Sequence, residues 1–399
     1  MDKRAYWIWL TEVLGPDARL SSVLEAYGTA QNVYESRERA LADNMLFSAA
    51  MHARMRSTLL SACEEQLETA LSSGYGVLCW EDAVFPERLK SFDTCPPVLY
   101  YMGDTSLLDG FLSIGCVGAR KPQALFRNLT LRVCRSLAGA GITLFSGFAA
   151  GIDADVHRAA FSAGAGSVAV LPCGIDVMYP AENRGLRRMT VKKGLMISQF
   201  APGSPPLPEH FRPRNRLLCM LCDGLLVSQA SLKSGSIMSG HLAMECGAEV
   251  FTFPDRPGNP ATAGNLQLLK EGAVLCTGPQ DIVLPFRGCV TDRQEGERLD
   301  RMIELGEGIL KDTPDQYVEQ LPEPGALQPV TNPGQGTALP ERLQGVYAAL
   351  GNAPVHIEQL SAALAIQPGQ LMAALTELEL LGFIQSLPGK QYVKKPHMS

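Results

Sequence analysis

Short apolar stretches alternate with longer amphipathic stretches through the middle of the chain. The apolar stretches are rich in Val, Ile, Leu and Phe and predict buried strands, while the stretches between them have the apolar spacing of helices. The predicted strands are 113–117, 142–145, 167–171, 195–198, 224–228 and 249–253, and the predicted helices lie at about 123–140, 153–165, 182–193, 212–222, 236–247 and 260–272. This alternation predicts the α/β class, with right-handed βαβ units that form an extended Rossmann-like, doubly wound, mostly parallel sheet.

The segments on either side of this region follow other patterns. Trp7, Leu10 and Val13 begin an apolar stripe at helical spacing, which predicts a small helical domain with a spacing that resembles a SAM domain. Two further strands, at 76–80 and 98–102, lie among prolines and lead into the α/β region.

The C-terminal part of the chain divides into a linker and a last domain. Prolines at 322, 324, 329 and 333 and an acidic excess predict a flexible linker with one short helix near residues 299–310. Beyond it, three helices and a hairpin resemble a winged helix, whose third helix, at about 368–381, carries no basic residue and does not favour reading of a DNA operator. The predicted domains are 1–72 (helical, SAM-like), 73–287 (Rossmann-like, core 106–287), 288–337 (acidic linker) and 338–399 (winged-helix-like).

Composition indicates a folded protein of a reducing compartment. The chain has 399 residues and 46% hydrophobic residues, and we find neither a secretory leader nor a run of about 18 apolar residues. Eleven cysteines are scattered through predicted helices and strands, as expected for buried thiols rather than disulfides. We therefore expect a cytoplasmic protein without a membrane segment. The single C-x-x-C, at 219–222, has no second ligand pair, so we expect neither a metal nor a cofactor.

The distribution of charge is more informative than its sum. The net charge is −6, yet residues 106–287 hold 18 Lys and Arg against 12 Asp and Glu, whereas residues 288–337 hold 4 against 10. A basic middle region is compatible with a nucleic-acid partner, and equally with an ordinary solvated surface.

A glycine-rich turn is predicted between the strand at 142–145 and the helix that follows. Gly147 and Gly151 permit a tight turn, and Asp153 is placed to cap the helix. Free N–H groups and the helix dipole would make this helix start an anion site. Because the spacing is neither G-x-G-x-x-G nor a P-loop, it indicates no particular nucleotide, and a turn that merely begins a helix explains it equally well.

Cationic side chains follow several predicted strands. Ligands of doubly wound sheets bind beyond the carboxyl ends of the strands, so these side chains are expected to converge on one rim with the glycine-rich turn. They are Arg120, Arg214, Arg216 and Lys233. Since we find no catalytic triad and no paired carboxylates there, the rim is expected to bind phosphates without cleaving them.

Five ordered motifs resemble the DNA-processing protein A family, DprA or Smf. They are Gly115–Arg120, Ser146–Asp153, Ala169–Asn183, Phe211–Arg216 and Lys233–Ser236. The resemblance implies a sequence-independent single-stranded DNA-binding protein that protects incoming strands, forms a homodimer and loads the RecA recombinase in natural transformation. It also implies no enzymatic turnover.

The same resemblance assigns the DNA contacts by position. Phe211 would stack on a base, although its position at the start of a helix favours a buried anchor over a stacking platform for this ring. His157 is interpreted as a structural histidine. The implied DNA-binding residues are Arg120, Ser146, Gly147, Gly151, Phe211, Arg214, Asn215, Arg216, Lys233, Ser234, Gly235 and Ser236, with no catalytic residue among them.

Two departures from the family pattern bear on the alternative functions. Gln199 and Gln229 stand where the family usually has glutamate. The alternative enzyme, a Rossmann-like nucleotide N-glycoside hydrolase, would be expected to keep a glutamate at the strand ends, so both amides disfavour it. A transcription regulator acting through the winged helix is a third alternative.

Overall fold

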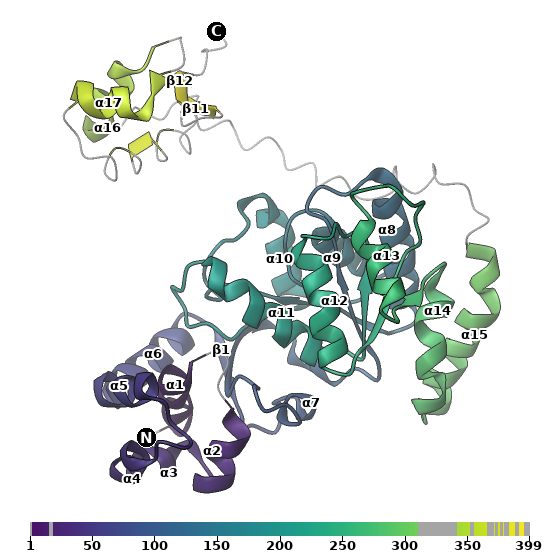
Figure 1. Ribbon diagram of the computed structural model, residues 1–399, viewed down its shortest axis with the longest axis horizontal. Coiled ribbons are helices and arrows are strands. Elements are labelled where there is room, and N and C mark those ends of the chain that lie inside the picture. The colour runs from purple at the N-terminus through teal and green to yellow at the C-terminus, as the bar shows by residue number, and fades with distance from the viewer. Residues whose placement is uncertain are drawn as a thin grey trace. The chain divides into compact units, whose positions relative to one another are not determined.

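The computed structural model describes residues 2–15, 19–309, 341–351, 355–364, 371, 374–375, 378, 383–387 and 391–394. The chain forms two compact units, residues 1–321 and 322–399. In the first unit, helices precede a large sheet that is covered by further helices (Figure 1).

The N-terminal residues form helices, as predicted. Helix α1 is central, because it packs against α3, α5 and α6. Its Trp7 and Trp9 are almost fully buried, and the Trp9 indole N–H donates to the Thr58 carbonyl at 3.2 Å. The helices are α1 (Arg4–Leu14), α2 (Leu20–Tyr27), α3 (Ala30–Glu35), α4 (Arg37–Ala42), α5 (Ala49–Ser57) and α6 (Leu60–Ser72).

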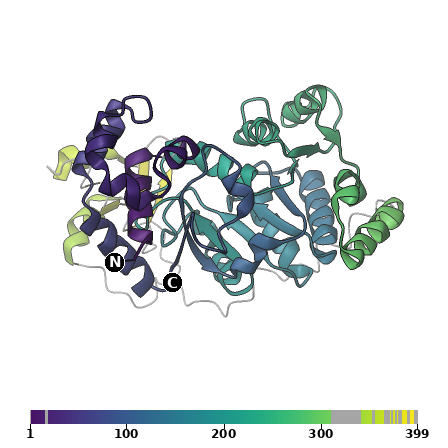
Figure 2. The same cartoon turned by 90° about the horizontal axis from the view of Figure 1, so that it is seen from below.

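These helices share their apolar core with the sheet. Trp7 and Leu10 belong to the same buried cluster as Val77 of β1, Leu171 after β5 and Met196 of β6. Figures 1 and 2 both show the N-terminal helices beside one end of the sheet and α15 toward the other end. Burial of large side chains at this junction stabilises the packing of the two parts by roughly 1.5–3 kcal/mol per side chain.

A nine-stranded sheet forms the centre of the first unit. Its order is β1-β2-β6-β5-β4-β3-β7-β8-β9, with antiparallel pairing of β1 to β2 and of β2 to β6 and parallel pairing elsewhere. The predicted parallel, doubly wound sheet is confirmed. The strands are β1 (Gly76–Cys79), β2 (Val98–Gly103), β3 (Ser113–Val117), β4 (Thr143–Ser146), β5 (Ser167–Val170), β6 (Leu195–Ser198), β7 (Gly224–Val227), β8 (Glu249–Thr252) and β9 (Val274–Leu275).

Helices cover both faces of this sheet. On β4, Leu144 packs in the cluster of α8 and α9, whereas its neighbour Phe145 packs in the cluster of α11 and α12, because successive strand residues point to opposite faces. The chain adds strands on one side of β3 and then on the other, so the switch point lies between β3 and β7. The helices are α7 (Glu87–Lys90), α8 (Ala124–Gly139), α9 (Ile152–Ser162), α10 (Arg184–Lys193), α11 (Phe211–Met220), α12 (Gly235–Glu245) and α13 (Ala263–Lys270).

The helix predicted near residues 299–310 is present and begins earlier. Helix α15 (Arg293–Ile309) packs against α14 (Pro279–Val283), and Leu299 is fully buried between them and the sheet helices. Arg287 and Asp300 form an ion pair at 2.5 Å. The rest of the predicted linker, residues 310–337, lies outside the described residues.

The second unit contains helices and a small sheet, as a winged helix requires. Its strands pair in the order β10-β12-β11 around a core that includes Leu360 and Leu375. Most of the predicted third helix and residues 388–390 of the wing turn predicted at 387–390 lie outside the described residues. The elements are α16 (Glu341–Ala349), β10 (Val355–His356), α17 (Ile357–Leu364), β11 (Ile384–Leu387) and β12 (Gln391–Lys394).

Candidate nucleic-acid interface

The glycine-rich turn after β4 has the expected shape but a different cap. Gly151, at φ 80°, is the N-cap residue of α9, and Asp153 lies inside the helix. The prediction that Asp153 caps α9 is therefore wrong in position. Its carboxylate instead accepts the Ala149 N–H at 3.3 Å and so closes the turn from behind.

The turn is fixed to neighbouring segments by backbone contacts. The Ile152 N–H donates to the Ala119 carbonyl at 3.2 Å, which joins the turn to the loop after β3. From another direction, the Asn183 side-chain amide donates to the Phe148 carbonyl at 2.8 Å. Asn183 has no predicted role, although it is the last residue of the Ala169–Asn183 motif. That position is the signal that the sequence offered.

Arg214 is an internal part of this turn rather than a surface cation. It is 5% exposed, and its guanidinium donates to the carbonyls of Gly147 and Val170, the latter at 2.8 Å. Burial lowers the pKa of Arg214, and the nearby Asp153 carboxylate opposes that shift. Burial raises the pKa of Asp153, and Arg214 opposes it. Removal of either side chain would leave the other buried charge without its compensating neighbour.

Gly147 fits between these two charged groups. A Cβ atom at this position would lie 2.7 Å from Arg214 Nη1 and 2.7 Å from Asp153 Oδ2. Ser146, immediately before it, is fully buried and donates its hydroxyl to the Cys116 carbonyl at 2.7 Å. The predicted DNA contacts of Ser146 and Arg214 remain predictions, but their polar atoms are already used inside the protein.

Phe211 and Arg120 form the outer surface next to the turn. Phe211 is the first residue of α11 and is half-buried, with its ring edge-on to Tyr179 at 6.0 Å. The guanidinium carbons of Arg120 and Arg214 lie 5.8 Å and 5.7 Å from the Phe211 ring centre. Because Arg120 is exposed, its guanidinium is accessible beside a partly accessible aromatic ring.

The remaining predicted residues lie on α11 and at the start of α12. Asn215 accepts a hydrogen bond from Arg214 Nε at 2.8 Å, and Arg216 reaches Glu245 of α12 at 3.9 Å. Lys233 is exposed just ahead of α12. Ser234 is the N-cap of that helix and accepts the Ile237 N–H at 3.3 Å. The following Gly235 is exposed and Ser236 is buried.

Gln229 has a structural partner at the switch point. Its side-chain oxygen accepts the Gln123 N–H at 2.9 Å, directly at the start of α8. A glutamate could accept the same hydrogen bond, so the amide at this position changes the charge of the switch point and leaves the contact possible. Gln199 follows β6, and the described residues offer its Nε2 atom no partner.

His157 is buried on α9, behind the turn. Its Nδ1 lies 2.8 Å from the Ser167 hydroxyl, while Nε2 has no hydrogen-bond partner among the described residues. Burial lowers the pKa of His157 from 6.5 to about 3, and the neighbouring Arg158 adds to the shift. The structural interpretation of His157 is supported by this geometry.

The buried His157 is expected to make stability depend on pH. Between pH 6.5 and about 3 the unfolded chain binds a proton that the folded protein does not, so the free energy of unfolding falls as the pH falls through this window. From about pH 7.5 to about pH 5.5, the wild type should lose about 1.4 kcal/mol more than His157→Gln. Urea unfolding followed by tryptophan fluorescence measures both. An equal loss in the two proteins would contradict the prediction.

Among the described residues, no helix is long and apolar enough to cross a membrane. Within the same residues, no group of three or more His, Cys, Asp or Glu is arranged to hold a metal ion.

Fold and site together define a class of protein. A doubly wound α/β unit carries arginines, an aromatic ring and a rigid glycine turn at its strand ends, and a second unit has the winged-helix arrangement. This is the class of nucleic-acid-binding α/β proteins. The chain belongs to the DprA/Smf family: residues 76–287 match DNA recombination-mediator protein A, and residues 331–390 match the DprA winged helix domain.

Curated relatives and the Streptococcus pneumoniae structure agree with this assignment. Protein Smf of Synechocystis is 29% identical over 98% of this chain and 99% of its own length. The DNA processing protein DprA of Streptococcus pneumoniae is 34% identical over 51% of this chain and 72% of its own. The crystal structure of the Streptococcus pneumoniae protein covers 71% of this chain and 98% of its own, with a TM-score of 0.62 and 26% identity. A Helicobacter pylori DprA, solved for its single-stranded DNA binding mode, covers 54% of this chain and 96% of its own at 30% identity and a TM-score of 0.49. A role in DNA processing and recombination follows from the family.

Proposed function

We propose that the protein binds single-stranded DNA without sequence preference along the surface formed by Arg120, Phe211 and Lys233. One observation carries the proposal: Arg120 is exposed and its guanidinium carbon lies 5.8 Å from the centre of the half-buried Phe211 ring, beside a turn that hydrogen bonds join to neighbouring segments. A guanidinium binds phosphate of any sequence, and an aromatic face stacks on any base, so the pair suits a single strand.

We assign different tasks to the residues of the site. Arg120, Phe211, Asn215, Arg216, Lys233 and Gly235 would contact the strand, together with the backbone from Gly147 to Gly151. Ser146, Arg214 and Ser234, whose polar atoms bind within the protein, would hold the contacting segments in place. Ser236, which is buried, would do the same from α12.

The biological role follows as part of the same proposal. A protein that holds strands by phosphate and stacking, without turnover, would protect them and deliver them to the RecA recombinase in the cytoplasm. We further propose that the Rossmann-like part dimerises through a helix face. Analytical ultracentrifugation with and without RecA tests both partners.

The proposal is tested by DNA binding at several salt concentrations. Arg120→Ala and Lys233→Ala should each raise the Kd for labelled oligo-dT by about tenfold at low salt, because each loses a charge-assisted phosphate contact. Each should also reduce the slope of log Kd against log salt by about 1. Fluorescence anisotropy measures both quantities.

A matched control uses an arginine far along the chain from the site. Arg293 has a side chain that is 91% exposed on α15, so Arg293→Ala should leave both quantities near their wild-type values. Tight binding that neither Arg120→Ala nor Lys233→Ala alters would place the DNA elsewhere. If oligo-dT does not bind at all, release of free base from a nucleoside monophosphate becomes the next assay, because it tests the N-glycoside hydrolase alternative.

A further inference from the structure

Helix α10 (Arg184–Lys193) carries an exposed row of cationic side chains. Arg184, Arg188 and Lys192 are exposed and stand four residues apart, so they lie along one face of the helix. We call these three side chains the α10 row. At a rise of about 1.5 Å per residue the row is about 12 Å long. Helix α10 contains no acidic residue, and Lys193 adds a further exposed cation at its end.

The stability of α10 does not explain the row. The ion pairs within the described part of the chain involve other side chains, and the exposed Glu182, two residues before Arg184, takes part in none of them. Like charges one turn apart destabilise a helix. The helix dipole favours Lys192 in the last turn but disfavours Arg184 in the first. An anionic ligand on this face would offset both costs.

The row begins next to the proposed DNA-binding surface. Asn183, the N-cap residue of α10, donates to a carbonyl of the glycine turn at 2.8 Å. The Arg187 guanidinium joins α10 to the loop after β5, because it donates to the Val177 carbonyl at 3.2 Å. Tyr179 of the same loop contacts the Phe211 ring. The start of α10 is therefore fixed beside both the turn and the ring.

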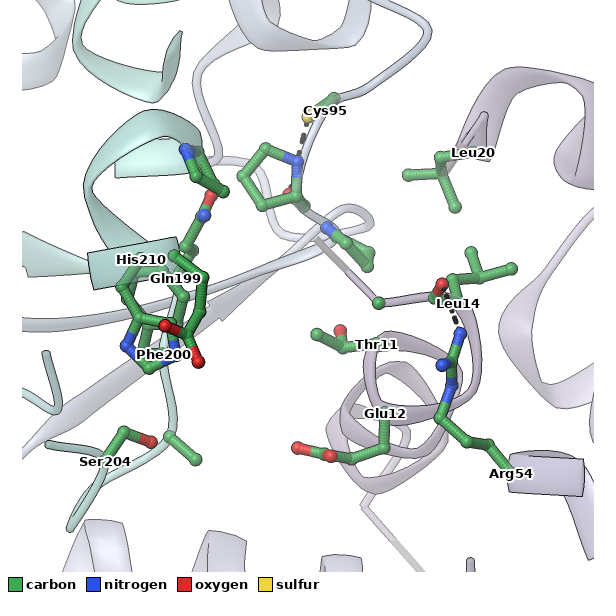
Figure 3. A pocket seen from close by; sticks show the side chains of 16 residues that line it. Thr11, Glu12, Leu14, Leu20, Arg54, Cys95, Gln199, Phe200, Ser204 and His210 are labelled. Carbon is green, nitrogen blue, oxygen red and sulfur yellow. Dashed lines mark hydrogen bonds between the residues drawn. The ribbon is translucent and has the colours of Figure 1, made fainter. Parts of the chain in front are cut away.

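A neighbouring pocket does not offer phosphates a comparable surface. The pocket, of about 530 Å³, opens between α1 and the segment that joins β6 to α11, and His210, directly before Phe211, lines it (Figure 3). Glu12 and Glu209 bring two carboxylates to its lining. Arg54 also lines it, but its guanidinium donates to two backbone carbonyls of α1 at 2.8 Å and 2.9 Å. Because carboxylates repel phosphates, a strand that leaves the Phe211 ring is expected to continue toward α10 instead.

We propose that the α10 row binds the backbone phosphates of a DNA strand that continues beyond the surface formed by Arg120, Phe211 and Lys233. Helix α10 carries no aromatic side chain, so the row contacts phosphates and adds affinity without any preference for a base. The inference rests on the proposed function, because the same strand must also occupy the Arg120 and Phe211 surface.

The test compares two lengths of labelled oligo-dT, about 6 nucleotides, near the lower end of single-domain site sizes, and about 20 nucleotides. In the full-length protein, the double variant Arg188→Gln/Lys192→Gln should raise the Kd for the long oligonucleotide about tenfold at low salt. It should also reduce the slope of log Kd against log salt by about 1–2, as expected for two lost phosphate contacts. The Kd for the short oligonucleotide should change by less than about twofold, because such a strand ends before the row. Fluorescence anisotropy measures all of these quantities.

A matched control removes two positive charges from α15. Arg293→Gln/Arg298→Gln changes two exposed positions and alters the net charge by the same amount, so both Kd values should stay near those of the wild type. Thermal unfolding checks the folding of both double variants. The α10 variant should not have a lower Tm than the wild type, because it removes both like-charge pairs of the row.

A loss of affinity that is confined to the long oligonucleotide supports the inference. If the α10 variant binds the long oligonucleotide like the wild type while Arg120→Ala weakens binding, the inference is overturned and the proposed function stands. That result would point to an acidic protein as the partner of the row. Equal weakening for both lengths also overturns the inference, because a track beyond the site cannot affect a strand that ends within it. Failure of the wild type to bind either length would overturn the proposed function, and the inference with it.

Discussion

Replacement of Gly151 by alanine is expected to lower the free energy of unfolding by about 3 kcal/mol. The residue has φ 80° and ψ −128°, a conformation that favours glycine, and a Cβ atom there would lie 2.4 Å from the Ala119 carbonyl and 2.5 Å from the Arg120 carbonyl. Backbone strain contributes about 1–2 kcal/mol, and the collision with backbone atoms adds about as much again. Urea unfolding followed by tryptophan fluorescence measures the loss.

Gly164 provides the control for backbone strain alone. It has a similar φ of 78°, but nothing lies within 4 Å of a Cβ atom built on it. Gly164→Ala should therefore cost only about 1–2 kcal/mol. If the two variants lose the same stability, the close approach of the loop after β3 to Gly151 adds nothing to the cost of the alanine side chain.

The second large effect is expected at Arg214. Arg214→Met should lower the free energy of unfolding by about 3–5 kcal/mol, because it removes one of two buried charges and leaves carbonyl groups without a donor. The carbonyls are those of Gly147 and Val170, and the remaining charge is that of Asp153. Urea unfolding again provides the measurement, and binding of oligo-dT should weaken as the turn loses its shape.

Arg212 is the matched control for this variant. It lies two residues earlier on α11 and is exposed, so Arg212→Met should change stability by about 0.5 kcal/mol or less. A similar small effect for Arg214→Met would show that its guanidinium is dispensable to the fold, and would return it to the DNA-contacting residues.

The strands were predictable because their apolar runs are short and bounded by turn residues. The predicted and observed bounds of β3 and β6 coincide, β5, β7 and β8 end one residue earlier than predicted, and β4 is shifted by one residue at both ends. The pairing order was not predictable in the same way. The position of β2 between β1 and β6 depends on tertiary contacts, such as the pairing of Tyr100 with Ser198 across the two strands. No local sequence pattern encodes such contacts.

The location of the candidate site was predictable from the sequence, whereas the roles of its individual residues were less so. Arg120 and Arg214 do lie near each other and Arg214 contacts the glycine turn, as expected where parallel strands end at one edge of the sheet. Arg216 instead reaches Glu245 of α12, and the place of Lys233 in the site stays a prediction.

Arginine, however, is expected at the surface when only the sequence is known. The burial of Arg214 depends on the carbonyls of Gly147 and Val170, which lie 67 and 44 residues away along the chain. The N-cap at Gly151 was missed for a related reason, since the Asp153 carboxylate accepts the Ala149 N–H of the turn and does not cap α9.

The anchoring of the glycine turn also bears on how fast a DNA strand would bind in the proposed function. The Ala119 carbonyl and the Asn183 amide already hold the turn in place, at 3.2 Å and 2.8 Å, before any ligand arrives. A preorganised surface of this kind loses little conformational entropy on association. Encounter would then be governed by diffusion and by the attraction between the exposed cations and the phosphates, and the association rate constant would fall with rising ionic strength.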